Sequence, residues 1–330
     1  MTESFIIGGY TKRLNEGIHE INFDDKNEKI ESSYLISSIS NPTYLCLNQE
    51  RNLLFSLIQE NDRSGVIAFR KINHEWQEIS RCFASKINGC HINYYEKTQT
   101  IYISNYHEGI INVYQFDTDK LNLLQTLYHT SHSRLHFTDV FPKHSILFAC
   151  DLGNNAIITY KIKKDGQLHK LFVNKTHDEM GPRHFVIHPS LNKMYVIGEY
   201  DNRVTSFDIT ENGQLVENIS YPTLPSDCTD SASGAAIKMT KDGNYIYTST
   251  RFSNFISVFK VLENGNLERI QTIDSVGQIP RDFALTEDEA FILVPHQDSD
   301  FISIFKRGRS TGELTFINNE TELPEAVCIK

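Results

Sequence analysis

The sequence has few cysteines, one tryptophan and no long hydrophobic run. Its six cysteines are scattered without a C-x-x-C pair, which argues against a zinc ribbon and a disulfide-stapled scaffold and favours reduced thiols. The longest apolar runs, such as 290–294, are far shorter than the roughly 20 residues of a membrane-spanning helix. No basic segment followed by an apolar stretch occurs near the start. We therefore expect a soluble, cytoplasmic protein without a membrane partner.

Positive charge is also in deficit. The 330 residues include 32 Lys and Arg against 42 Asp and Glu, a formal net charge of −10, which argues against nucleic acid as a partner. A Gly-rich phosphate loop, a G-x-S-x-G elbow and an H-E-x-x-H motif are all missing. His129, His132 and His136 have helical spacing in a segment that is not helical, and 298–300 offers too few calcium ligands. We expect neither a metal nor a cofactor.

What the sequence does contain is a repeat. A short apolar strand start recurs seven times, at residues 42, 89, 134, 182, 234, 280 and 324. Each of the first six is followed by a second strand rich in aromatic and β-branched residues, then by a third with a period of two. Hairpin signals such as Asp165-Gly166 and Asn212-Gly213 precede a fourth strand. Seven such units of about 47 residues predict an all-β, seven-bladed β-propeller.

The phase of the repeat predicts how the ring closes. The N-terminal region begins with a second strand, at residues 5–8, and 324–329 form a first strand with no second strand after it. We therefore expect Ala326–Ile329 to pair with Phe5–Gly8, so that both ends of the sequence build one blade. Residues 1–330 would then form a single propeller domain.

Two rings of residues should meet at one mouth of the central channel. In an antiparallel hairpin the start of the first strand and the end of the second lie at the same edge. At the third position of the strand start the repeats place Tyr44, His91, His136, His184, Ala236, Asp282 and Ala326, and Arg183 and Arg281 precede two of these. The second strands end in Gly9-Tyr10, Gln59-Glu60, Asn105-Tyr106, Asp151-Leu152, Gly198-Glu199, Thr250-Arg251 and His296-Gln297. Purely structural positions would be alike and apolar, so this mixed polar set indicates a functional site.

The residues suit a small anionic substrate hydrolysed by an activated water. Histidine is the commonest general base, and arginine can hold a phosphate or carboxylate or steady an oxyanion.

Several segments also resemble a known family. Gly8–Thr11, Asn41–Leu45, Gly181–Phe185, Pro280–Phe283 and Gln297–Asp300 are similar to the propeller-type lactonases, whose best-known members are seven-bladed 6-phosphogluconolactonases. The resemblance extends over the whole chain. It implies hydrolysis of 6-phospho-D-glucono-1,5-lactone to 6-phosphogluconate in the pentose phosphate pathway. The sequence departs from the family pattern at Arg134, Gly198 and His296, where the family often has His, Asn and Asn.

The chemistry of these side chains suggests roles for individual residues. We predict that His184, oriented by Glu199, takes a proton from the attacking water while His91 or an arginine supports the oxyanion. The predicted substrate-binding residues are Arg183, Arg281, Arg251, His136, Asn105, Asp151, Asp282, His296 and Gln297.

Each role has a structural alternative. His91 and His136 could be spacers between blades, and Asn105 and Asp151 could be turn residues. Arg183 and Arg281 could form ion pairs with Asp282 or Glu60.

Two alternative functions stay open. The same family pattern includes enzymes that form muconate lactones, so the protein could be a cycloisomerase acting on a muconate-like dicarboxylate. It could also be a non-catalytic scaffold that binds partners at this mouth.

Overall fold

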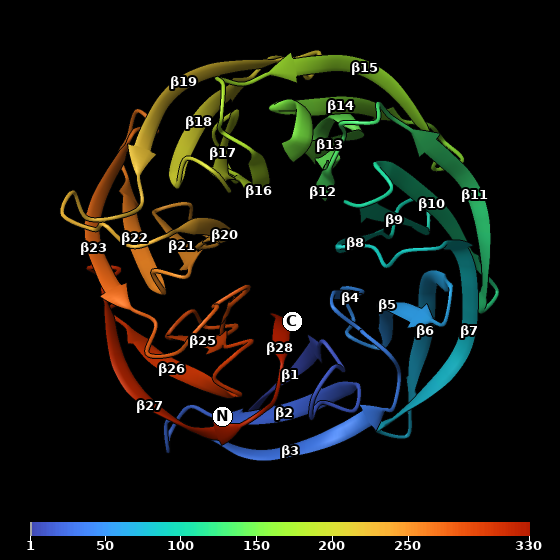
Figure 1. The fold of residues 1–330 in the computed structure, drawn as a ribbon, viewed down its shortest axis with the longest axis horizontal. Coiled ribbons are helices and arrows are strands. Elements are labelled where there is room, and N and C mark those ends of the chain that lie inside the picture. Colours follow the sequence, from blue (N-terminus) through green and yellow to red (C-terminus); the bar gives the residue numbers. More distant parts are fainter. Residues whose placement is uncertain (1) are drawn as a thin grey trace.

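The computed structural model describes residues 2–330 as a ring of seven four-stranded antiparallel sheets (Figure 1). From the channel outward, blade 1 is β4 (Leu45–Leu47), β5 (Leu53–Glu60), β6 (Arg63–Ile72) and β7 (Glu75–Ser85); blade 2 is β8 (His91–Tyr95), β9 (Thr100–Asn105), β10 (Ile110–Asp117) and β11 (Lys120–Tyr128). In the same direction, blade 3 is β12 (Leu135–Phe141), β13 (Ile146–Asp151), β14 (Ala156–Ile162) and β15 (Leu168–Lys175); blade 4 is β16 (Pro182–Ile187), β17 (Lys193–Gly198), β18 (Arg203–Ile209) and β19 (Leu215–Pro222). Blade 5 is β20 (Ser233–Met239), β21 (Tyr245–Arg251), β22 (Phe255–Val261) and β23 (Leu267–Asp274); blade 6 is β24 (Ala284–Leu285), β25 (Phe291–Pro295), β26 (Phe301–Arg307) and β27 (Leu314–Glu322). Blade 7 is β28 (Ala326–Ile329), β1 (Thr2–Gly9), β2 (Ile18–Asp24) and β3 (Lys29–Ser37).

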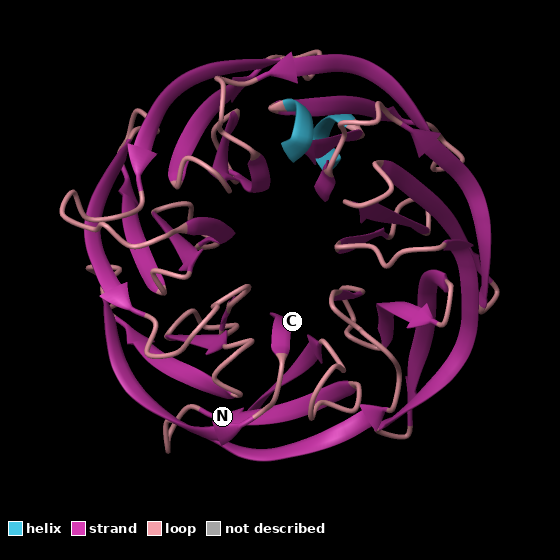
Figure 2. Ribbon diagram, viewed as in Figure 1, coloured by secondary structure: helices cyan, strands magenta, loops and turns pink. Residues whose placement is uncertain are grey.

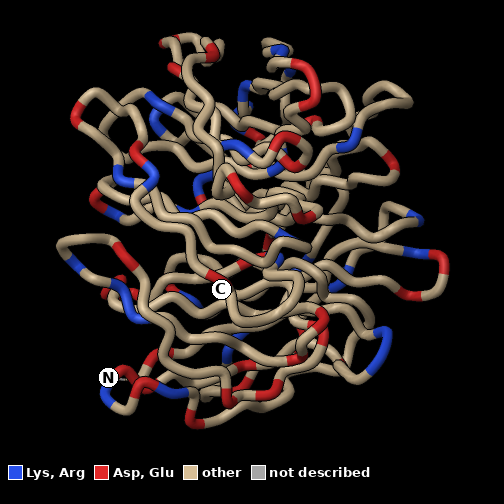
Figure 3. The backbone as a smooth tube through the Cα atoms, turned by 60° about the vertical axis from the view of Figure 1, so that its left-hand side comes forward, with Lys and Arg blue, Asp and Glu red and all other residues tan. Residues whose placement is uncertain are grey.

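Burial explains why the second strand of each blade is so apolar. Every residue of β9, β13 and β25 is buried, because both faces of a blade pack against neighbouring blades. Outer strands such as β3 are mostly exposed, with five consecutive exposed residues at 31–35. Figure 3 shows that positively and negatively charged residues are intermixed along the backbone without a large region of one sign.

Tyrosine hydroxyls join successive blades through the hairpin glycines. Tyr102 donates to the carbonyl of Gly166 at 2.9 Å, and Tyr195 donates to that of Gly265 at 2.7 Å. Both glycines have positive φ, 84° and 78°, which other residues adopt at a cost. The turn glycines predicted from the sequence therefore also fasten one blade to the next.

The predicted ring closure is confirmed. Ile7 pairs with Ile329 and Gly8 with Cys328 in an antiparallel ladder. Beyond it, the backbone of Ile6 exchanges two hydrogen bonds with Lys330, at 2.7 and 2.9 Å. Blade 7 is thus built from both ends of the sequence.

Helix is confined to two short 3₁₀ turns of blade 3, η1 (Pro142–His144) and η2 (Leu152–Asn154), within the described residues (Figure 2). No helix formed by residues 2–330 is long and apolar enough to cross a membrane.

Candidate active site

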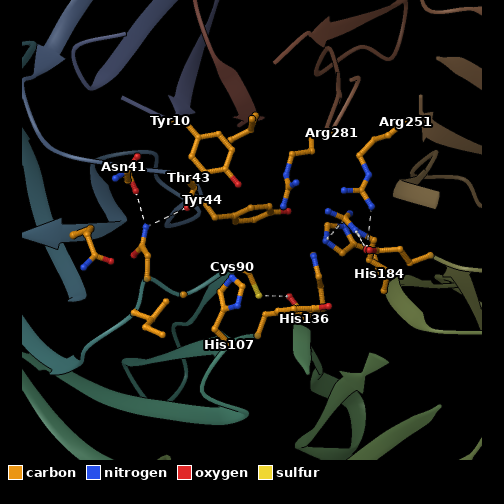
Figure 4. Close-up of a pocket in the computed structure, with 18 of the residues that line it drawn as sticks. Tyr10, Asn41, Thr43, Tyr44, Cys90, His107, His136, His184, Arg251 and Arg281 are labelled. Atoms are coloured by element: carbon orange, nitrogen blue, oxygen red, sulfur yellow. Dashed lines mark hydrogen bonds and ion pairs between the residues drawn. The ribbon is translucent and has the colours of Figure 1, made fainter. Parts of the chain in front are cut away.

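A cavity of about 370 Å³ opens at one mouth of the channel, where the two rings of residues meet (Figure 4). Its lining comprises Tyr10, Lys12, Asn41, Thr43, Tyr44, Gln59, Ile87, Asn88, Gly89, Cys90, Tyr106, His107, His136, Arg183, His184, Glu199, Arg251, Arg281 and Val327. The lining contains four cationic side chains but one carboxylate. The structure therefore brings together six of the predicted residues, His136, Arg183, His184, Glu199, Arg251 and Arg281.

Bulges in the inner strands supply part of this lining. In blade 3, Leu135 opposes Asp151 and Phe137 opposes Cys150, which leaves His136 as the extra residue. The same shift leaves Arg183 unpaired between Pro182 and His184 in blade 4. A bulge redirects the side chain of its extra residue. Strand period alone does not reveal these bulges.

Glu199 links two arginines in the cavity wall. Its Oε2 lies 2.9 Å from Nε of Arg183 and 3.1 Å from Arg251. Arg183 is almost fully buried and also donates to the carbonyl of Ala235, and Arg251 donates to the Ser233 hydroxyl. Burial, and then the nearby charge of Arg251, lowers the pKa of Arg183 to about 9. These contacts hold both arginines in place, and Arg183, with a pKa of about 9, stays charged at neutral pH.

The sequence suggested that Glu199 orients His184, but the carboxylate binds the two arginines instead. The Nε2 of His184 lies 3.3 Å from Nη1 of Arg183. An arginine only donates, so the Nε2 lone pair accepts this contact. Burial and the charge of Arg183 hold the pKa of His184 well below its ordinary value. The lowered pKa keeps His184 neutral at neutral pH, and its Nε2 lone pair is occupied by Arg183.

His136 differs from His184 in lacking a partner. Within residues 2–330 no group forms a hydrogen bond with its ring, and its buried Nδ1 is unsatisfied. The ring centroid lies 5.1 Å from that of His184, and the side chain lines the cavity. Burial, followed by the charges of three arginines, holds the pKa of His136 well below 6.5. Of the two strand-start histidines in the lining, His136 and His184, only His136 has a ring free of hydrogen bonds within the described residues.

His91 lies beside the cavity lining. Its ring packs 4.5 Å from Tyr44 and 4.1 Å from Phe137, and its Nδ1 accepts the backbone N–H of Thr138 at 3.4 Å. These contacts fit a spacer between blades, the structural alternative that the sequence left open for His91.

Four other predicted residues lie outside the cavity lining, three of them in local hydrogen-bond networks. Asn105 accepts the N–H of Glu108, and Asp151 accepts from Ser133 and from the N–H of Arg134, as turn residues do. His296 is buried and its Nε2 lies 3.0 Å from the Ser303 hydroxyl. Gln297 contacts Asp298 on the surface.

Asp282 also lies outside this lining, in a buried cluster between two cavities. Its carboxylate is 3.2 Å from Nζ of Lys238 and 3.5 Å from Nζ of Lys330. Lys330 also donates to the Tyr44 hydroxyl at 3.2 Å. The lysines line a second cavity of about 1050 Å³ at the opposite mouth. Burial would raise the pKa of Asp282, but the two lysines hold it below its ordinary value. Arg183 and Arg281 thus do not pair with Asp282.

Replacing Asp282 by Asn should destabilise the protein by about 3 kcal/mol, because two partly buried lysines would be left without a counter-charge. Each lysine side chain is about a quarter exposed, at 26% and 24%, so we expect the lower end of the range for a broken buried pair. Urea unfolding followed by circular dichroism measures the change. Asp298→Asn, at an exposed site in the same blade, is the control. Equal unfolding free energies for the two variants would contradict the prediction.

Lys12, His107 and Tyr10 line the cavity although the sequence pattern assigned them no role. Tyr10 stood at the end of a second strand, but Lys12 and His107 lie in loops that the repeat does not constrain. The only available signal was their closeness to those strand ends.

Comparison with known proteins gives a consistent result. Residues 4–330 match the family model described as lactonase, 7-bladed beta-propeller. A 6-phosphogluconolactonase of Bacillus subtilis is 29% identical over 339 residues, covering 98% of this chain and 97% of that protein. A crystal structure from Lactobacillus plantarum, 30% identical, superposes with a TM-score of 0.96 over 100% of this chain and 99% of that one. The periplasmic gluconolactonase of Pseudomonas aeruginosa, 21% identical, has the same fold, with a TM-score of 0.94 over the same shares of the two chains.

Proposed function

Since the chain belongs to the seven-bladed β-propeller lactonase family, we propose that it hydrolyses a phosphorylated sugar lactone, 6-phospho-D-glucono-1,5-lactone, to the open acid. One observation carries this proposal. A protein of net charge −10 gathers four cations, one carboxylate and a neutral, unpartnered histidine around one cavity. This arrangement suits an anion that reacts with water.

We assign the general base to His136 in place of His184. Water attacks the lactone carbonyl carbon, and Nε2 of His136 takes its proton as the new C–O bond forms. The C–O bond to the ring oxygen then breaks, and His136 returns the proton to that oxygen. Arg183 and Arg251, fixed by Glu199, stabilise the negative charge on the carbonyl oxygen.

The phosphate of this substrate also bears on where the protein acts. A doubly charged ester does not cross a membrane unaided. We therefore propose a cytoplasmic role in the pentose phosphate pathway.

Acid release from freshly prepared phosphogluconolactone tests the proposal. We expect the protein to release acid faster than the spontaneous opening of the lactone does. The negative control is His136→Gln, for which we expect little acceleration. No acceleration would overturn the proposal. In that case, turnover of a muconate would identify a cycloisomerase, and tight binding of a protein at this mouth would identify a scaffold.

A further inference from the structure

Two cations lie against one aromatic ring at the rim of the cavity. The ring belongs to Tyr10, which follows β1. Nζ of Lys12 is 4.5 Å from its centroid, and the guanidinium carbon of Arg281, at the start of blade 6, is 5.9 Å from it. Figure 4 shows Tyr10 and Arg281 beside each other, facing the same space. An aromatic face attracts a cation, but two cations near one ring repel each other.

Lys12 and Arg281 differ from the inner arginines, Arg183 and Arg251, in whether a carboxylate pairs with them. Arg183 and Arg251 share the carboxylate of Glu199. In contrast, Lys12 and Arg281 form no ion pair with any carboxylate in the part of the chain that the structure describes. Among the described residues, the two positive charges at the rim therefore have no carboxylate paired with them.

The backbone that carries Lys12 is fixed in place. The carboxylate of Glu325 accepts the backbone N–H groups of Lys12, Arg13, Leu14 and Asn15 at distances of 2.7 to 3.2 Å. The guanidinium of Arg13 also pairs with Asp300 at 2.7 Å. Because the backbone of the loop is anchored, only the lysine side chain has to be ordered when a ligand binds, which lowers the entropic cost of binding.

We infer that Tyr10, Lys12 and Arg281 form a subsite for a phosphate monoester dianion on the substrate. A monoanionic carboxylate would be matched by the planar fork of Arg281 alone, whereas a dianion also uses the point charge of Lys12. The inner arginines are then left for the reacting carbonyl. The inference rests on the proposed function and specifies which end of the substrate the rim holds.

The test compares two lactones that differ only in the phosphate, 6-phosphogluconolactone and gluconolactone. The unmodified protein should prefer the phosphorylated one in kcat/KM. Lys12→Met should lower that preference about tenfold, mainly by raising KM for the phosphorylated lactone, and Lys12→Arg should restore most of it. Lys26→Met removes an exposed positive charge from the same blade and is the matched control. An unchanged preference in Lys12→Met, or an equal loss in the control, would overturn the inference.

A binding measurement separates this inference from the proposed function. Calorimetry should show 6-phosphogluconate binding more tightly than gluconate, and Lys12→Met should reduce the difference. If neither lactone is hydrolysed but this pattern holds, the proposed hydrolysis fails and the subsite stands. If the two acids bind equally, the subsite fails whatever the activity.

Discussion

Replacing His136 by Gln is expected to lower kcat/KM for the lactone about 100- to 10,000-fold, the usual contribution of a general base. Glutamine keeps much of the volume of the ring but cannot take a proton. The expected change is in kcat, because the substrate is held mainly by the cations. Initial rates of acid release measure it, and circular dichroism checks that the fold is retained.

His184→Gln is the matched comparison. Its Nε2 is engaged by Arg183, so we expect its loss to reduce kcat/KM less than the loss of His136. A larger effect at His184 would return the general base to the residue that the sequence suggested. Near wild-type activity of His136→Gln would remove His136 from the mechanism.

The pH profile gives an independent check. Because burial and three arginines hold the pKa of His136 well below 6.5, its neutral form dominates at neutral pH. On the acidic side, kcat/KM should therefore fall to half its maximum at a pH below 6.5. A midpoint at or above pH 6.5 would contradict the assignment.

Unfolding in acid must be separated from protonation of the base. His91, His136 and His184 all have pKa values lowered mainly by burial. The unfolded chain therefore binds more protons than the folded protein below about pH 6.5, and folding stability falls as the pH drops. Each histidine contributes a slope of up to about 1.4 kcal/mol per pH unit. Circular dichroism at each pH identifies the range in which the protein is still folded.

Deletion of residues 324–330 should abolish the stable fold. The four residues of β28 are buried, and fully burying a side chain such as Val327 or Ile329 is worth about 1.5 to 3 kcal/mol. The deletion also leaves the backbone groups along the inner edge of β1 unpaired. The combined loss is comparable with the total stability of an ordinary domain, about 5 to 15 kcal/mol. Thermal unfolding and size-exclusion chromatography measure the outcome.

A circular permutant supplies the control for this deletion. Residues 324–330, placed before residue 2 through a flexible linker, would form the first strand of blade 7 in the order used by the other six blades. We expect the permutant to fold, since the strand is present and only its connection has changed. A truncated chain with the thermal stability of the full chain would show that β28 is not needed for ring closure.

The fold could be predicted from the sequence because the same packing demand recurs in every blade. Buried second strands and glycine turns leave a periodic pattern, and the phase of that pattern specified the pairing of β28 with β1. The meeting of His136, Arg183 and Glu199 at one mouth followed from hairpin geometry. These features depend on the backbone, which the pattern constrains.

The contacts within the site could not be predicted in the same way. Whether Glu199 binds His184 or the arginines depends on side-chain rotamers and on the bulge at Arg183. Asp282 holds the same repeat position as His184 but pairs with Lys238 of blade 5 and with Lys330, which follows β28. Lys12 lies in a loop fixed by Glu325, a contact between residues more than 300 positions apart. Partners that lie so far apart in the sequence leave no signal in the residues around each of them.

The partly buried contact between Lys330 and Tyr44 has a consequence for turnover. It joins Tyr44, which lines the first cavity, to Lys330, which lines the second, and we expect it to confine substrate arrival and product departure to the same opening. Opening a lactone adds a carboxylate, and the departing molecule is more negative than the one that came in. It must leave past Lys12 and Arg281, whose attraction increases with that charge. We expect product release to limit the rate at saturating substrate, and inhibition by accumulated product to follow from the same geometry.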